Sequence, residues 1–105
     1  MITQEQINEV VEVIVKRFKP KKIILFGSYA NGTPTEGSDL DLLIIKDSDV
    51  PSRLQNRAVR KMLYGLRVPV DVIVKTTKEF ETYKDIIGTI MYPANKFGRV
   101  VYESR

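Results

Sequence analysis

Cysteine, histidine and tryptophan are all absent from this chain of 105 residues. Without cysteine, disulfides, thiolate zinc sites and cysteine nucleophiles are excluded. Without histidine, the commonest general base and every imidazole metal ligand are missing. Acid–base or metal chemistry must therefore use carboxylates, lysine or tyrosine, and such hard oxygen ligands select Mg²⁺ or Mn²⁺.

Long apolar runs are also missing, and acidic residues are in the minority. No run approaches the roughly 20 apolar residues of a membrane span, and the N-terminus does not read as a signal peptide, so we expect a cytoplasmic protein with no membrane partner. The 17 basic and 13 acidic residues give a net charge of +4, which suits solubility or a polyanionic partner. Nucleic acid is the less favoured partner because basic and aromatic residues are not interleaved.

The length and the 43% hydrophobic content predict one folded domain over residues 1–105, because the chain is too short for two cores. We expect the α/β (α+β) class, with about four strands and helices packed against them. The patterns predict strands at 23–26, 39–45, 70–74 and, at an edge, 99–102, and helices at 4–18, at 51–66 and after Thr76. The near-continuous apolar run of the second strand indicates a central position.

The sequence predicts which side chains form the faces of two of these helices, and it leaves the structure of one segment undecided. In the 51–66 helix, apolar residues recur at a spacing of four, and the other face is basic, which fits a solvated surface, an acidic partner or RNA. The apolar set is Leu54, Ala58, Met62 and Leu66, and the basic set is Arg53, Arg57, Arg60 and Lys61. After Thr76, Phe80 and Tyr83 are expected to face the core. Residues 88–97 form either a short helix with Pro93 near its start or an irregular segment.

A glycine-serine turn follows the first predicted strand. Gly27 and Ser28 come directly after an apolar run and precede about one helical turn that ends at Gly32. Gly27 has no Cβ, so the backbone can turn sharply and approach a ligand, while Ser28 offers a hydroxyl and a backbone N–H at the positive end of the turn. Such a place suits a phosphate.

Two aspartates open the second predicted strand, as Asp39-Leu40-Asp41. Residues two apart on a strand point to the same side, so both carboxylates face one point, with their Cα atoms roughly 6.5 Å apart. They can converge on one Mg²⁺, or on two ions about 3.5 to 4 Å apart, as in two-metal phosphoryl transfer. A divalent ion also removes the repulsion between the carboxylates.

A third aspartate, Asp71, lies inside the apolar strand of residues 70–74. An acid in such a strand is either a further metal ligand or one half of an ion pair with lysine or arginine. A Gly-Ser pair and an Asp-x-Asp pair also occur as an ordinary turn and an ordinary polar strand entrance. Their arrangement favours a functional site, because separate strands carry them around a loop rich in Gly, Thr, Pro and Ser.

Taken together, these residues resemble the minimal nucleotidyltransferases of the DNA polymerase beta superfamily. The likeness rests on Gly27-Ser28, on Asp39-x-Asp41 eleven residues after Ser28, and on the distant single Asp71. It extends from about Lys21 to Glu103, and it implies a palm-like mixed sheet of about four strands. Many members carry an arginine near the Gly-Ser pair, where this chain has Tyr29 and Asn31.

The resemblance implies transfer of a nucleoside monophosphate, AMP from ATP, to a hydroxyl group. In this reading Gly27 and Ser28 hold the β- and γ-phosphates. Asp39 and Asp41 bridge two Mg²⁺ ions, with Mn²⁺ as an alternative, and Asp71 ligates the ion beside the attacking oxygen. The absence of histidine is compatible with this chemistry, because the metal lowers the pKa of the attacking hydroxyl.

The chain has no residues left for a domain that grips the acceptor, so the acceptor must bring its own binding surface. The resemblance implies a separately encoded helical partner, a HEPN-type toxin ribonuclease, for which this chain is the antitoxin. Two other functions stay open: an antitoxin that acts by binding alone, and a small basic RNA-binding module. The intact set of three acids favours the enzyme.

Overall fold

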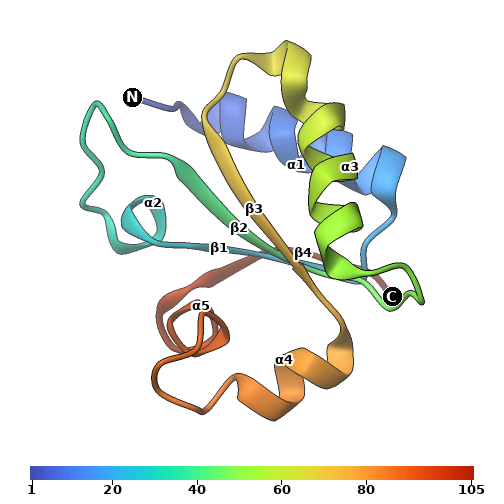
Figure 1. The fold of residues 1–105 in the computed structure, drawn as a ribbon. Coiled ribbons are helices and arrows are strands. Elements are labelled where there is room, and N and C mark those ends of the chain that lie inside the picture. The colour runs from blue at the N-terminus through green and yellow to red at the C-terminus, as the bar shows by residue number, and fades with distance from the viewer.

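The computed structural model describes residues 1–105, all of the chain, as a four-stranded sheet with helices on both faces (Figure 1). The strands are β1 (Lys22–Phe26), β2 (Leu40–Ile45), β3 (Val70–Lys75) and β4 (Arg99–Glu103). The helices are α1 (Gln4–Phe18), α2 (Ser28–Asn31), α3 (Ser52–Leu63), α4 (Thr77–Tyr83) and α5 (Met91–Phe97), and a 3₁₀ turn, η1, spans Tyr64–Leu66. The predicted α+β class and four-stranded sheet are confirmed.

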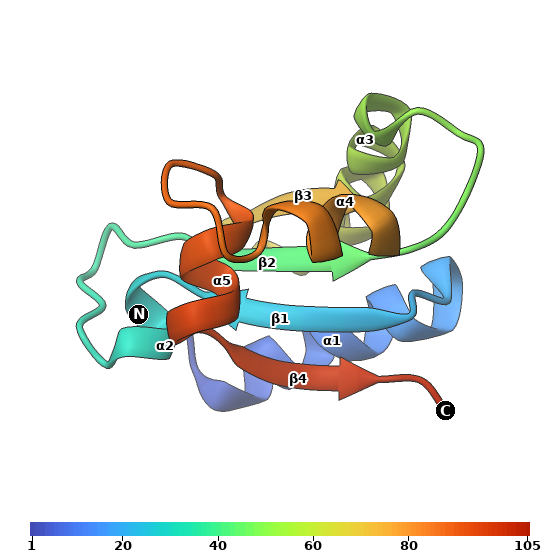
Figure 2. The same ribbon diagram turned by 90° about the horizontal axis from the view of Figure 1, so that it is seen from below.

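The strand order in the sheet is β3-β2-β1-β4. Strand β1 runs antiparallel to both neighbours, β2 and β4, whereas β2 and β3 are parallel, as Figure 2 shows. The parallel pair needs a crossover, and α3 supplies it. Strand β2 is therefore internal, as its continuous apolar run predicted, and β4 is an edge strand, as predicted.

Two apolar clusters hold the layers together. The larger lies between the sheet and the helices α1 and α3, and it includes Val10, Ile14, Leu42 and Val59, each with no exposed surface. The smaller lies on the opposite face under α4 and α5, around Leu43, Phe80 and Met91. Both faces of β2 are therefore covered, which explains why apolar side chains occupy successive positions from Leu42 to Ile45.

Helix ends follow the capping signals in the sequence. The Thr3 hydroxyl accepts a hydrogen bond from the Gln6 N–H at 3.1 Å, and Thr76 forms the same capping box with Glu79. Helix α5 answers the question left open for residues 88–97. Pro93 is its third residue, and a proline in the first turn is tolerated because N–H groups there lack helical partners anyway.

Two expectations about side-chain burial hold only in part. The buried residues of α3 are Gln55, Val59 and Leu63, one position along from the predicted apolar set. Of that set, Met62 and Leu66 pack against the core, whereas Leu54 is 44% exposed. The reason is that Gln55 is buried with its amide donating to the Val50 carbonyl at 3.1 Å, so a polar residue occupies a core position. Phe80 is buried as predicted, but Tyr83 is 42% exposed because it ends α4.

No helix of the chain is both long and apolar enough to cross a membrane.

One side chain of α3 forms a hydrogen bond with the backbone of the edge strand β3. The Asn56 carboxamide oxygen accepts a hydrogen bond from the Val74 N–H at 2.7 Å, in a partly buried position. We predict that Asn56→Ala lowers the free energy of unfolding by about 0.5–1.5 kcal/mol, the usual net contribution of such a bond. Urea denaturation measures this, with Asn8→Ala on the exposed face of α1 as the control. Equal midpoints for the two variants would contradict the prediction.

Candidate functional site

The site lies at the end of the sheet where β1 finishes and where β2 and β3 begin. In the strand register, Phe26 of β1 is opposite Asp41 of β2, and Asp41 is opposite Asp71 of β3. Directly opposed residues point to the same face, here the face covered by α4 and α5. Two of the three predicted acids are therefore neighbours on adjacent strands, and the glycine-serine turn follows immediately after Phe26.

Gly27 adopts a backbone conformation that other residues avoid, with φ +76° and ψ −155°. A Cβ atom at this position would lie 2.2 Å from Oδ2 of Asp41, far inside van der Waals contact. Glycine is therefore required for two reasons, the positive φ and the close approach of the carboxylate. The turn and the Asp39-Leu40-Asp41 segment, expected separately from the sequence, are in direct contact.

The turn continues into α2, which is closed by backbone hydrogen bonds. The N–H groups of Ala30 and Asn31 both donate to the Gly27 carbonyl, at 3.1 and 3.0 Å. The first N–H groups of a helix have no partner within it, so those of Ser28 and Tyr29 are directed away from the helix at its start. This confirms the predicted passage from strand to helix N-terminus, a geometry that suits anions.

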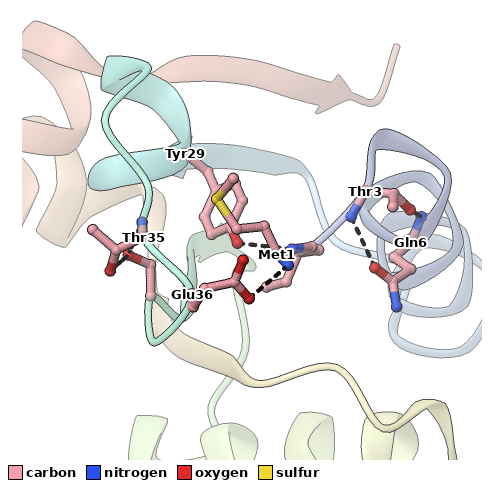
Figure 3. Close-up of polar contacts among 8 residues, drawn as sticks. Met1, Thr3, Gln6, Tyr29, Thr35 and Glu36 are labelled. Atoms are coloured by element: carbon pink, nitrogen blue, oxygen red, sulfur yellow. Dashed lines mark hydrogen bonds and ion pairs between the residues drawn. The ribbon is translucent and has the colours of Figure 1, made fainter.

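N-terminal residues hold the turn and the loop that follows it (Figure 3). The Ile2 N–H donates to the Tyr29 hydroxyl at 2.8 Å, and the Met1 amino group lies 3.4 Å from Oε2 of Glu36. Within the loop, the Thr35 N–H donates to the Ser38 hydroxyl at 2.9 Å. The first two contacts connect the residues before α1 to α2 and to the loop that separates Gly27-Ser28 from the acids, and the third lies within that loop.

Asp41 is partly buried and is close to other negative charges. Burial raises the pKa of the Asp41 carboxyl above its ordinary value, and the charges of Asp71 and then of Asp39 raise it further. The cause is that a desolvated carboxylate beside like charges is costly to ionise. The three predicted acids therefore share one electrostatic environment, in which a cation would be favourable.

Asp71 forms an ion pair with an arginine, which was the alternative to metal binding that the sequence left open. Oδ1 of Asp71 lies 3.7 Å from Nη2 of Arg60 on α3, and the two side chains are 53% and 59% exposed. Exposed pairs at such a separation contribute about 0–1 kcal/mol, so the contact does not prevent Asp71 from binding another cation. Sequence reasoning placed Arg60 on a basic helix face and missed its position beside Asp71. The signal was the β2-α3-β3 crossover, which lays α3 against β3.

The two remaining predicted site residues are Asp39 and Ser28. Asp39 precedes β2 and is exposed, so the strand starts one residue later than predicted and Asp39 belongs to the loop. Ser28 is the first residue of α2. No group of three or more acidic side chains is arranged to hold a metal ion by itself.

Comparison with known proteins gives the family. The family model described as "Nucleotidyltransferase domain" matches residues 7–94. MJ0604 of Methanocaldococcus jannaschii, which carries a provisional protein adenylyltransferase name, is 35% identical over 97% of this chain and 100% of its own length. The protein adenylyltransferase MntA of Thermococcus cleftensis is 30% identical over 88% of this chain and 97% of its own length.

Solved structures share the fold. A toxin-antitoxin complex with AMP-PNP contains a chain that superposes with a TM-score of 0.65 at 18% identity, over 93% of this chain and 73% of that one. A chain in a complex of tri-AMPylated Shewanella oneidensis HEPN toxin with MNT antitoxin superposes with a TM-score of 0.58 at 16% identity, over 96% of this chain and 72% of that chain. With the family model covering most of its length and close relatives aligned end to end, this chain belongs to the nucleotidyltransferase family and is an enzyme of that class.

Proposed function

We propose that this nucleotidyltransferase uses Mg²⁺ and ATP to transfer AMP to a hydroxyl of a partner protein, a HEPN-type toxin for which it is the antitoxin. Two observations support the choice of partner and nucleotide. Relatives of 30 and 35% identity carry protein adenylyltransferase names, and structural neighbours are antitoxins bound to HEPN toxin or crystallised with AMP-PNP. We further propose that this occurs in the cytoplasm.

The observation that carries the proposal is the contact between the Gly27 backbone and the Asp41 carboxylate. A turn suited to phosphate and a carboxylate suited to metal lie so close that no Cβ fits between them. A phosphate bound at the turn would therefore be next to a cation bound at Asp41. This is the arrangement that a metal-bound nucleoside triphosphate requires.

The donor set fits Mg²⁺ or Mn²⁺. Asp39, Asp41 and Asp71 offer only carboxylate oxygens. Burial first, and then the charges of Asp71 and Asp39, raise the pKa of the Asp41 carboxyl, and a divalent ion would relieve the repulsion among these charges. Mg²⁺ usually binds through one or two carboxylates together with substrate phosphates. Since no three acids enclose a point by themselves, we propose that two ions bind along with the nucleotide. Once bound, such ions neutralise phosphate charge and lower the pKa of the attacking hydroxyl.

The chain's own residues then act mainly by positioning. The Gly27-Ser28 turn holds the β- and γ-phosphates through backbone N–H groups and the Ser28 hydroxyl, and Asp39 and Asp41 would hold the ions that position the α-phosphate. The acceptor oxygen forms a bond to the α-phosphorus while the bond from that phosphorus to the bridging oxygen of the β-phosphate breaks. Pyrophosphate leaves, and the hydroxyl proton passes to solvent beside the exposed Asp71.

The alternative function is inhibition of the toxin by binding alone, and the Asp71–Arg60 ion pair is the contact that separates it from catalysis. Asp71 is paired with Arg60, so the third acid is engaged when no metal is bound. A chain in which this pair persists would keep the fold and the partner surface without chemistry. The experiments below separate the two functions.

Gly27→Ala tests the close contact. We expect the variant to lose about 1–3 kcal/mol of stability from the disfavoured backbone conformation, and to bind AMP-PNP with Mn²⁺ at least tenfold more weakly because the Asp41 carboxylate is displaced. Thermal melts and calorimetric titration measure these effects. Gly32→Ala is the matched control, because its φ is also +76° but a Cβ there meets nothing within 4 Å. Equal loss of nucleotide binding in both variants would show that the contact between Gly27 and Asp41 is not needed for nucleotide binding.

Asp41→Asn tests the metal site through stability. Because the pKa of Asp41 is raised in the folded state, ionised Asp41 destabilises the fold, and this effect develops as the pH rises through the folded pKa. Without metal, the variant should therefore melt above the parent at pH 7, and the difference should disappear below the ordinary pKa of 3.8.

Millimolar Mn²⁺ should reverse that order, since an ion at 100 times its Kd adds about 2.7 kcal/mol to the parent alone. Asp49→Asn, an exposed acid away from the site, is the control and should respond like the parent. If Asp41→Asn gains as much from Mn²⁺ as the parent does, the metal is not at Asp41.

The chemistry itself is tested by intact-mass spectrometry of the helical protein encoded by the adjacent gene, after incubation with the chain, ATP and Mg²⁺. We expect a mass gain of AMP on that partner. Asp39→Asn, Asp41→Asn and their double variant should each abolish nearly all transfer, with losses that do not add, because the two act as a unit. Ser28→Ala should be milder, about 1.5–3 kcal/mol for one charge-assisted hydrogen bond. A stable complex with an unmodified partner would leave inhibition by binding alone as the function.

A further inference from the structure

A pocket of about 290 Å³ lies where the chain turns from α3 into β3, and its lining ends at the residue before Asp71. This turn is at the top of Figure 1, beside the first residues of β3. Most of the lining is apolar, and two guanidinium groups complete it. The residues that matter here are Arg60, Leu63, Tyr64, Arg67, Val68 and Val70. Arg60 thus belongs both to this pocket and, through its ion pair with Asp71, to the acid site.

The turn that forms the pocket has an unusual conformation and an unusual surface. Arg67, the residue that follows the 3₁₀ turn, has φ +56°, in the left-handed region that residues other than glycine rarely adopt. Tyr64, which begins the 3₁₀ turn and also lines the pocket, is 89% exposed. Tyrosine and arginine are enriched at protein interfaces, so an exposed tyrosine together with two arginines has the composition of an interface.

The strand order indicates on which side of the reacting phosphate the pocket lies. The Gly27-Ser28 turn follows β1, Asp41 is on the central strand β2, and Asp71 is on β3. In phosphoryl transfer, the attacking and leaving oxygens lie on opposite sides of the phosphorus. If the β- and γ-phosphates are at the turn after β1, the acceptor hydroxyl must arrive from the β3 side. Arg60 and the pocket are on that side.

We propose that this pocket receives the segment of the acceptor protein that carries the reacting hydroxyl, and that this segment is acidic beside that hydroxyl. The inference rests on the proposed function and adds the place and chemistry of the acceptor. Charge complementarity supports it, because Arg60 and Arg67 line the pocket. Three further basic residues are exposed on α3, the helix of Arg60: Arg53, Arg57 and Lys61. An arriving carboxylate gives Arg60 an alternative partner and so releases Asp71 to face the hydroxyl. Arg60 is on this account a positioning residue.

Chemical-shift mapping tests the pocket without requiring transfer. The ¹⁵N-labelled chain, with AMP-PNP and Mg²⁺, is titrated with the peptide Glu-Asp-Tyr-Glu-Asp and, separately, with Lys-Arg-Tyr-Arg-Lys. We expect the acidic peptide to shift amides of residues 60–71 and the basic peptide to leave them unchanged. The double variant Arg60→Gln, Arg67→Gln should raise the Kd of the acidic peptide at least tenfold. The matched control Arg99→Gln, on the opposite edge strand, should leave this Kd unchanged.

Several results would overturn the inference: no binding of the acidic peptide at millimolar concentration, equal shifts with both peptides, or shifts centred on the exposed apolar residues Tyr83, Ile87 and Phe97 instead. The outcome is separable from that of the proposed function. AMP transfer to the partner with an unchanged acceptor KM in the double variant keeps the chemistry and removes the pocket. Pocket binding with no transfer by the parent keeps the pocket and removes the chemistry.

Discussion

The contact between the Gly27 backbone and the Asp41 carboxylate is the constraint on which the site depends. It exists because β1 and β2 pair antiparallel with Phe26 opposite Asp41, so the residue after β1 passes directly over the second residue of β2. One strand pairing thereby brings together a turn for phosphate and a ligand for metal. A shift of the register by one residue would turn Asp41 to the other face and would separate the two.

This arrangement has an electrostatic penalty that the rest of the fold must offset. Asp41 is desolvated and close to two like charges, which raises its pKa and makes its ionised form unfavourable in the folded chain. The offsetting contribution comes from apolar burial on both faces of β2, where Leu42, Leu43 and Ile44 have no exposed surface. The acids at one end of the strand are tolerated because the remainder of the same strand is buried in both apolar clusters.

Much of the fold could be predicted from local patterns, because the strands are apolar runs and the helices begin with capping boxes at Thr3 and Thr76. The core face of α3 could not, since Gln55 is polar and is buried only because Val50 accepts its amide proton. At the site, the residue types and spacings identified five candidates. Their contacts could not be read from spacing, because the proximity of Gly27 to Asp41, and of Arg60 to Asp71, arises from strand register and from the crossover helix.

The parallel pairing of β2 with β3 also bears on when the site forms. Asp41 and Asp71 are opposite one another only after the whole of α3 and its following turn have crossed the sheet, so their juxtaposition is a non-local contact. Non-local contacts form late in folding, because the chain between them must first be ordered. The complete set of acids therefore exists only once β3 has paired with β2, whereas Gly27 and Asp41 are brought together by the more local pairing of β1 with β2.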